Sequence, residues 1–156
     1  MASNVITVEN AFNLLSEGLK KQEKFKVGSF KEFIQNIWCY SFDHPEYFQA
    51  WHVGVLADDI EECLETGMNY VAVLPRFHFK STVLGHAFSV WRLLTAQRDC
   101  SVLYLSYSDG MAKYHISEIN KAISRNPILN EILVNRSPKA DFSARYYFNN
   151  KPVEIM

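Results

Sequence analysis

The sequence has little of what defines several protein classes. Its three cysteines, Cys39, Cys63 and Cys100, lie apart and form no CxxC pair, so we predict neither a disulfide framework nor a zinc site, and a reducing cytoplasm fits best. No run reaches the roughly 20 apolar residues of a membrane span. The first thirty residues mix Asn, Glu and Lys among apolar positions, unlike a signal peptide. We therefore expect a soluble protein without membrane contact.

A strong charge of one sign is also absent. Sixteen basic and seventeen acidic side chains give a formal net charge of -1, so the chain as a whole has no electrostatic attraction for a nucleic-acid backbone. Any contact with DNA must therefore be local. Hydrophobic residues make up 48% of the 156 residues and charged residues 21%, which predicts a packed core rather than a disordered chain.

Apolar residues at helical spacing predict helices in the first part of the chain. The spacing favours amphipathic helices over residues 8–22 and 30–40. Pro45 suits a helix start and Gly67 a helix end, so a third helix is predicted between them. We place an N-terminal helical segment at residues 1–44 and a second unit at residues 45–156.

The second unit alternates strands and helices. Residues 70–74 form an almost wholly apolar run that predicts a strand buried on both faces, and residues 81–97 predict a helix buried against the sheet. Residues 101–105 predict another strand, followed by a helix that ends near Asn126 because Pro127 disfavours helical backbone before it. Residues 146–148 and 153–155 flank Asn149 and Asn150 and suit a hairpin. The order indicates an α/β fold with parallel strands.

The segment that carries chemistry is residues 75–82, between the predicted buried strand and buried helix. A phosphate-binding loop requires backbone N–H groups at a helix N-terminus, a lysine and a hydroxyl for Mg²⁺. Lys80 and Ser81 provide the lysine and the hydroxyl. The standard pattern G-x-x-x-x-G-K-[ST] places glycines where this chain has Leu74 and Phe79, although glycine reaches backbone angles that are costly for other residues.

The run Leu-Pro-Arg-Phe-His-Phe-Lys-Ser-Thr resembles the deviant Walker A motif of the large terminase subunits of tailed bacteriophages. That motif commonly reads Pro-Arg-x-x-Gly-Lys-Ser and has relatives with His-Phe-Lys-Ser. Residues 47–52 are similar to the family's aromatic segment before the first strand. Residues 102–106 and 126–129 resemble its second strand and following helix. The resemblance covers residues 45–156 and implies part of a P-loop NTPase-like parallel sheet flanked by helices, with N-terminal helices and a C-terminal hairpin.

The resemblance implies a site for ATP and Mg²⁺. Lys80 would neutralise the β and γ phosphates, Ser81 would ligate Mg²⁺, and the N–H groups of residues 78–82 would cradle the phosphates, with Thr82 at a lower phosphate. Arg76 matches the family's arginine that is directed at the γ phosphate. Arg76 and Lys80 are thus the implied catalytic residues. A solvated arginine beside a proline is the alternative interpretation of Arg76.

Other implied neighbours of the nucleotide come from the loop and the helix before it. Phe77, His78 and Phe79 would line the nucleotide through the loop backbone. Trp51 and His52 are candidates for stacking on the adenine and for hydrogen bonding to its edge. A Trp on an amphipathic helix equally suits a core position, and a His there can be incidental.

Two parts of the family are missing from the sequence. No apolar strand ends in Asp-Glu, as a Walker B motif would, and the acidic cluster of the terminase nuclease domain is absent. We therefore expect the N-terminal nucleotide-binding part of the DNA-packaging motor, which does not hydrolyse ATP by itself. The implied partners of the full motor are double-stranded DNA, the portal protein and the small terminase subunit, in the host cytoplasm, with a homo-oligomeric ring possible.

Two alternatives stay open at this point. One is a noncatalytic α/β interaction module with a degenerate P-loop, which the loss of both glycines favours. The other is a fragment of another P-loop ATPase such as a helicase, which does not predict Pro75 and Arg76 directly after the first strand. Ser108 and Asp109 follow the second predicted strand, and helix capping is the favoured interpretation of both.

Overall fold

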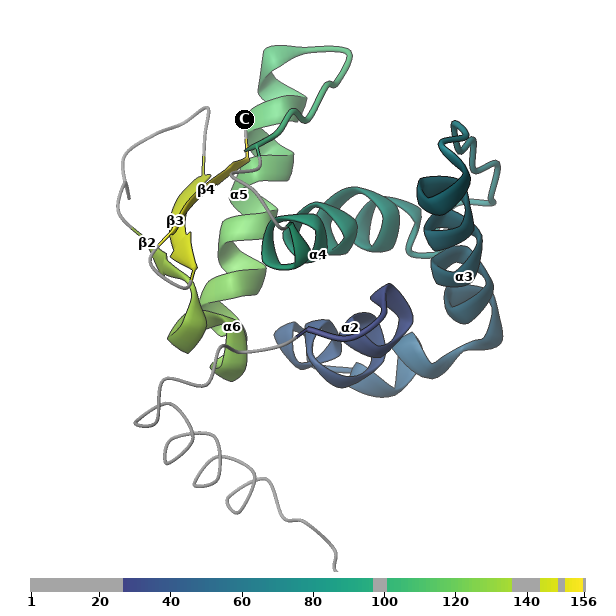
Figure 1. The fold of residues 1–156 in the computed structure, drawn as a ribbon, viewed down its shortest axis with the longest axis horizontal. Coiled ribbons are helices and arrows are strands. Elements are labelled where there is room, and N and C mark those ends of the chain that lie inside the picture. The colour runs from purple at the N-terminus through teal and green to yellow at the C-terminus, as the bar shows by residue number, and fades with distance from the viewer. Residues whose placement is uncertain (1–26, 97–100, 136–143, 149–150, 156) are drawn as a thin grey trace, which may run out of the picture.

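Figure 1 shows the arrangement of the helices and the small sheet in a computed structural model, which describes residues 27–96, 101–135, 144–148 and 151–155. The central helix α4 lies between the long helix α5 and the helices α2 and α3, and the sheet lies beside α5. The helix predicted over residues 8–22 and the Asn149–Asn150 turn fall outside the described residues.

The first described helix is specified by its cap. α2 (Phe30–Asn36) begins at Ser29, whose hydroxyl accepts from the N–H of Glu32 while the Glu32 carboxylate accepts from the N–H of Ser29, a capping box. The helix predicted over residues 30–40 is confirmed in part, because it breaks at Ile37 and continues as the short 3₁₀ helix η1 (Trp38–Ser41).

The predicted third helix is two elements. A 3₁₀ helix, η2 (Pro45–Gln49), precedes α3 (Trp51–Thr66), and the chain between them is extended at Ala50. The predicted end is confirmed, because Gly67 has a φ of 70° and adopts the left-handed conformation that ends helices.

The next helix starts with an unusual geometry. Residues Ser81–Ala87 form a π-helix, η3, which continues as the α-helix α4 (Phe88–Thr95), so the helix predicted over 81–97 is present. π-helical turns are rare and occur frequently at functional sites. The indole N–H of Trp91 donates to the carbonyl of Gly28 at 3.1 Å and connects α4 to the start of α2.

Asn126 organises the end of the next helix. α5 (Asp109–Arg125) ends at Asn126, as Pro127 predicts, and α6 (Pro127–Ile132) begins there. The buried Asn126 side chain accepts from the N–H groups of Ile128 and Leu129 and donates to the carbonyl of Ile37 at 2.7 Å. This residue therefore caps α6 and fixes it against the N-terminal helices.

The strands form one small sheet in the order β1-β4-β3-β2. β1 (Ser101–Val102) pairs in parallel with β4 (Lys151–Ile155), and Val102 lies opposite Ile155. β3 (Ala144–Phe148) pairs antiparallel with β4 and with β2 (Val134–Asn135). The predicted hairpin is therefore confirmed, and the second predicted strand is present only at its first two residues.

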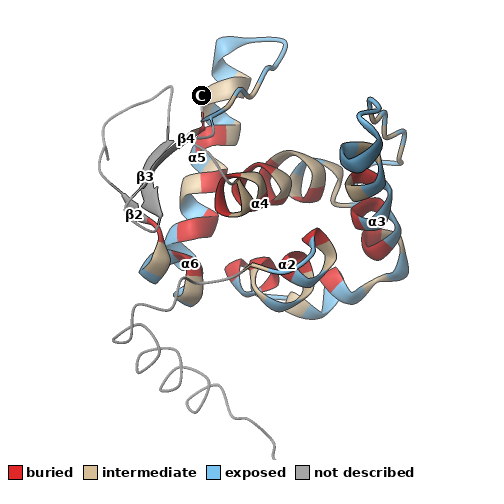
Figure 2. Cartoon of the chain, in the orientation of Figure 1, coloured by how far each residue is buried: buried red, intermediate tan, exposed pale blue. Residues whose placement is uncertain are grey.

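One hydrophobic core joins the N-terminal helices to the rest. Its largest fully buried side chains include Trp38, Phe30, Phe33, Phe48 and Ile119. In Figure 2 the buried segments of α2, α3, α4 and α5 face one another across the interior. Within the described part of the chain, none of the helices combines the length and apolar character that crossing a bilayer requires.

The expectation of a strand buried on both faces at residues 70–74 is wrong for the described structure. No strand is formed there, and Val71 and Val73 are 82% and 90% exposed. Tyr70, Ala72 and Leu74 are half-buried, so exposure alternates along the segment as side chains of an extended chain do. The apolar run is present, but none of the described strands pairs with it.

Candidate functional site

The loop at residues 75–80 is closed by its own lysine. The Lys80 ammonium donates to the carbonyl oxygen of Leu74 at 2.8 Å, six residues earlier, and the lysine is half-buried. The side chain therefore lies along the loop instead of extending into solvent. Lys80 is the N-cap residue of η3, so it lies at the helix start where the sequence predicts a phosphate-binding motif.

Two phenylalanines in this loop have left-handed backbone. Phe77 has a φ of 66° and Phe79 a φ of 56°, and among the described non-glycine residues only these two have positive φ. Left-handed backbone costs an L-residue roughly 1–2 kcal/mol, and such strain is found at functional sites. Phe79 occupies the motif's second glycine position, so it has there a backbone conformation that glycine adopts without strain.

The two phenylalanines differ in what surrounds them. Phe77 is 98% exposed, and its ring does not close the loop. The half-buried Phe79 packs its ring at 5.1 Å from the ring of the buried Phe48 and at 6.4 Å from that of Tyr47. The aromatic residues of η2 thus contact the loop directly.

The helix that follows the loop starts without a side-chain cap. Its first residue is Ser81, which is exposed, and the next, Thr82, is half-buried. The first N–H groups of a helix have no partner within it, and the N-terminus carries partial positive charge. Unpaired donors, an ammonium group and two hydroxyl groups therefore meet here, and they suit a phosphate group and its metal ion.

The two candidate adenine neighbours lie at the start of α3, beside the loop. Trp51 is 81% exposed, so the core interpretation of this residue is wrong. The His52 ring lies 5.6 Å from the ring of His78 in the loop. The His52 Nε2 atom is buried and has no hydrogen-bond partner among the described residues, a condition that costs about 1–3 kcal/mol. Of the two residues, His52 is therefore the one with a ring contact to the loop.

Arg76 and His78, two further loop residues, differ in their surroundings. The Arg76 side chain is exposed, which fits both a solvated arginine and one that reaches a phosphate. The His78 Nδ1 lies 2.9 Å from the carbonyl oxygen of Arg76, and since a carbonyl only accepts, Nδ1 carries the proton. His78 therefore stabilises the loop turn through this hydrogen bond.

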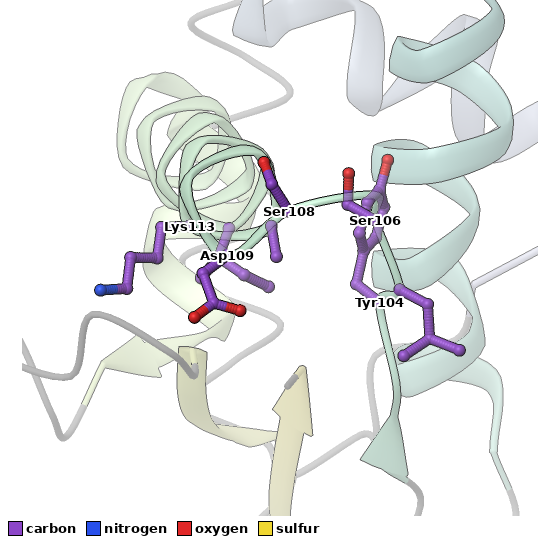
Figure 3. Close-up of a pocket in the computed structure, with 8 residues that line it drawn as sticks. Tyr104, Ser106, Ser108, Asp109 and Lys113 are labelled. Carbon is purple, nitrogen blue, oxygen red and sulfur yellow. The ribbon is translucent and has the colours of Figure 1, made fainter.

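A hollow lies at the end of the segment that follows β1 (Figure 3). Its volume is about 230 Å³, below the ~300–1,000 Å³ of typical ligand pockets. The Ser108 hydroxyl accepts from the N–H of Met111 at 3.4 Å, and Asp109 lies in the first turn of α5. Capping is therefore confirmed for Ser108, and the acidic residue opposes anion binding. Its lining comprises Tyr104, Leu105, Ser106, Ser108, Asp109, Ala112, Lys113 and Ile116.

A histidine pair that the sequence did not predict joins η3 to α5. His86 Nε2 and His115 Nδ1 lie 2.9 Å apart, and the ring of Tyr104 packs 4.9 Å from that of His115. Burial, with His115 nearby, lowers the pKa of His86 to about 4, and burial also lowers the pKa of His115. The two residues are 29 positions apart, so no spacing rule indicates the pair. Among the described residues, no three His, Cys, Asp or Glu side chains group as metal ligands.

Comparisons with known proteins identify no relative of this chain. No protein-family model, curated protein or solved structure matches the chain.

Proposed function

We propose that the chain is the N-terminal nucleotide-binding part of a phage large terminase subunit, and that it binds ATP with Mg²⁺ at residues 75–82. The observation that carries the proposal is the loop itself. Lys80 folds back onto the carbonyl of Leu74, and Phe79 has left-handed backbone at the position where the motif has glycine. An uncapped helix start supports anion binding at this loop, because the first N–H groups of a helix have no partner within it.

The residues present fit the two groups that the proposal requires. Lys80 and the N–H groups of Ser81 and Thr82 would hold the phosphates, and the Ser81 hydroxyl would hold Mg²⁺. The exposed Trp51 offers a flat surface for the base, and His52 is the proposed partner for its edge. When bound, the metal ion would neutralise charge on the phosphates. The role of Arg76 at the γ phosphate is part of the same proposal.

The proposal concerns binding, not turnover. The sequence contains no apolar strand that ends in Asp-Glu, so the residues that hold and activate water in this class are not supplied by these 156 residues. Packaging of double-stranded DNA, with the portal protein, the small terminase subunit and a ring of copies, belongs to the proposal for the full motor. The chain's formal net charge of -1 places any DNA contact elsewhere or in a local patch.

Titration calorimetry with MgATP tests the binding proposal. Lys80→Ala removes the only lysine in the loop, and charged hydrogen bonds contribute roughly 1.5–3 kcal/mol each, so we expect its affinity to fall at least about tenfold. Lys121→Ala is the matched control, because Lys121 is an exposed lysine on α5 that pairs with Glu118 at 2.7 Å. Its affinity should equal that of the wild type. Equally weak heats in all three proteins would favour the interaction module instead.

A further inference from the structure

The two left-handed residues of the loop are an unequal pair. Phe77 and Phe79 both have positive φ, at 66° and 56°. Phe77 is almost fully exposed, whereas Phe79 packs against the ring of Phe48 at 5.1 Å. Only the second residue, which directly precedes Lys80, therefore has a neighbour that can compensate for strained backbone.

Phe48 is well placed to act as a support. It lies on η2, is 1% exposed, and packs its ring at 5.1 Å from that of Phe42. Its position is therefore fixed by the core and does not depend on the loop. Its contacts are with other side chains, and it contributes no group to the phosphate-binding end of η3. Any influence on a ligand must pass through Phe79.

We infer that Phe48 is a positioning residue for the phosphate-binding loop: its contact with Phe79 holds that residue in left-handed backbone and so replaces the motif's glycine. The carbonyl of Phe79 accepts from the N–H of Val83 at 2.7 Å, so the orientation of Phe79 also fixes the start of η3. If the Phe79 backbone left this conformation, the N–H groups of Lys80 and Ser81 would turn away from a common point. The inference rests on the proposed nucleotide binding.

A cycle of substitutions tests this role. Phe48→Leu keeps an apolar side chain in the core but removes the ring that Phe79 packs against, and we expect it to weaken MgATP binding about fivefold or more in the wild-type background. In the Phe79→Gly background the loop adopts positive φ without support. The same Phe48→Leu change should then weaken binding less than about twofold.

The other left-handed residue supplies the matched control. Phe77→Gly also introduces a glycine at positive φ, two residues away, but Phe77 does not contact Phe48. In the Phe77→Gly background, Phe48→Leu should therefore weaken binding as much as it does in the wild type. An equal Phe48→Leu loss in the wild-type and Phe79→Gly backgrounds would overturn the inference, and so would a wild-type affinity in the single variant Phe48→Leu. All affinities are measured below the lowest thermal midpoint among the variants.

A ligand-free measurement separates this inference from the proposed function. At a left-handed position glycine is favoured over alanine, because alanine carries the steric cost of a Cβ. Phe79→Gly should thus melt at a higher Tm than Phe79→Ala, and the inference fails if alanine is at least as stable. If that order holds but the wild type binds no MgATP, the proposed nucleotide binding fails, and with it the positioning role, while the loop conformation stands.

Discussion

Two loops of this chain lead from an apolar segment into a helix, and they differ in what occupies the helix start. Before α5, Ser108 caps the first turn and Asp109 adds a negative charge. Before η3 there is no side-chain cap, no acidic residue in the first turn, and a lysine that lies along the loop. Of these two helix starts, only that of η3 has neither a side-chain cap nor an acidic first turn.

The difference shows how a helix start is committed either to stability or to binding. A cap satisfies the N–H groups that an anion would otherwise bind, and an acidic first turn uses the partial positive charge of the helix. The uncapped start of η3 leaves these groups available, and its strained Phe77 and Phe79 backbones are the cost of shaping the loop. The following predictions test this division of roles.

The largest expected effect concerns the histidine pair that joins the two helices. The pKa of His86 is about 4 in the folded chain against 6.5 when unperturbed, so the unfolded state binds more protons as the pH falls. The stabilisation that comes from keeping His86 neutral in the folded chain is complete above pH 6.5 and is lost as the pH falls from 6.5 to 4. At about 1.36 kcal/mol per pKa unit, the free energy of unfolding should fall by about 3 kcal/mol over that range. Urea denaturation at pH 7 and pH 4 measures it.

The histidine prediction has a matched pair of variants. His86→Gln removes the buried titrating group and should remove most of the extra acid sensitivity relative to the wild type. His44→Gln removes an exposed histidine that pairs with Glu46 at 3.0 Å and should change that sensitivity much less. His115, whose pKa is also lowered by burial, contributes in the same direction. Identical pH profiles for wild type and His86→Gln would contradict the expected linkage.

The second effect tests the uncapped helix start. Ser81 is exposed, and its hydroxyl makes no side-chain cap contact, so Ser81→Ala should leave the thermal midpoint nearly unchanged. If Ser81 ligates the metal ion, affinity for ATP in the presence of Mg²⁺ should fall about 30-fold, or roughly 2 kcal/mol. Without Mg²⁺ the variant and the wild type should bind alike. A loss of the same size in both conditions would assign Ser81 to the phosphate and not to the metal.

The helices of this fold are predictable from sequence because their signals are local. The helix end at Gly67 and the helix boundary at Asn126–Pro127 depend on residues close by in the sequence, and the structure confirms both. The break of the helix at Ile37 is not predictable in this way, because it coincides with a contact to Asn126, 89 residues away. The segment 70–74 shows the same limit: its apolar residues predict burial, but burial requires a partner strand that local sequence does not identify.

The candidate site is predictable in its residue types but not in its geometry. Lys80 and Ser81 stand out because a lysine and a hydroxyl after an apolar run have a chemical use at a helix start. The sequence does not predict left-handed backbone at Phe79, since a bulky residue normally avoids that conformation. The ring that packs against Phe79 belongs to Phe48, 31 residues earlier. The His86–His115 pair escapes prediction for the same reason.

The third effect concerns the apolar segments that lead into the two loops. Both segments expose apolar side chains, Val71 and Val73 in the first and Leu103 and Leu105 in the second, but of the two only the second begins in a described strand, β1, which pairs with β4. Exposed apolar strand-like segments promote association, so we expect the wild-type chain to self-associate in sedimentation experiments. Val71→Thr with Val73→Thr should raise the dissociation constant of this self-association about tenfold. Val55→Thr, an exposed valine on α3, is the control and should leave it unchanged.

The smallest expected effect tests the capped helix start. Ser108→Ala removes the hydroxyl that accepts from the N–H of Met111, and the loss of an N-cap costs about 1 kcal/mol of folding free energy. Its MgATP affinity should equal that of the wild type, the reverse of the pattern expected for Ser81→Ala. Urea midpoints and calorimetric titration of both variants give the comparison directly. If Ser108→Ala lost nucleotide affinity while Ser81→Ala lost only stability, the roles of the two helix starts would be exchanged, and the anion site would lie before α5.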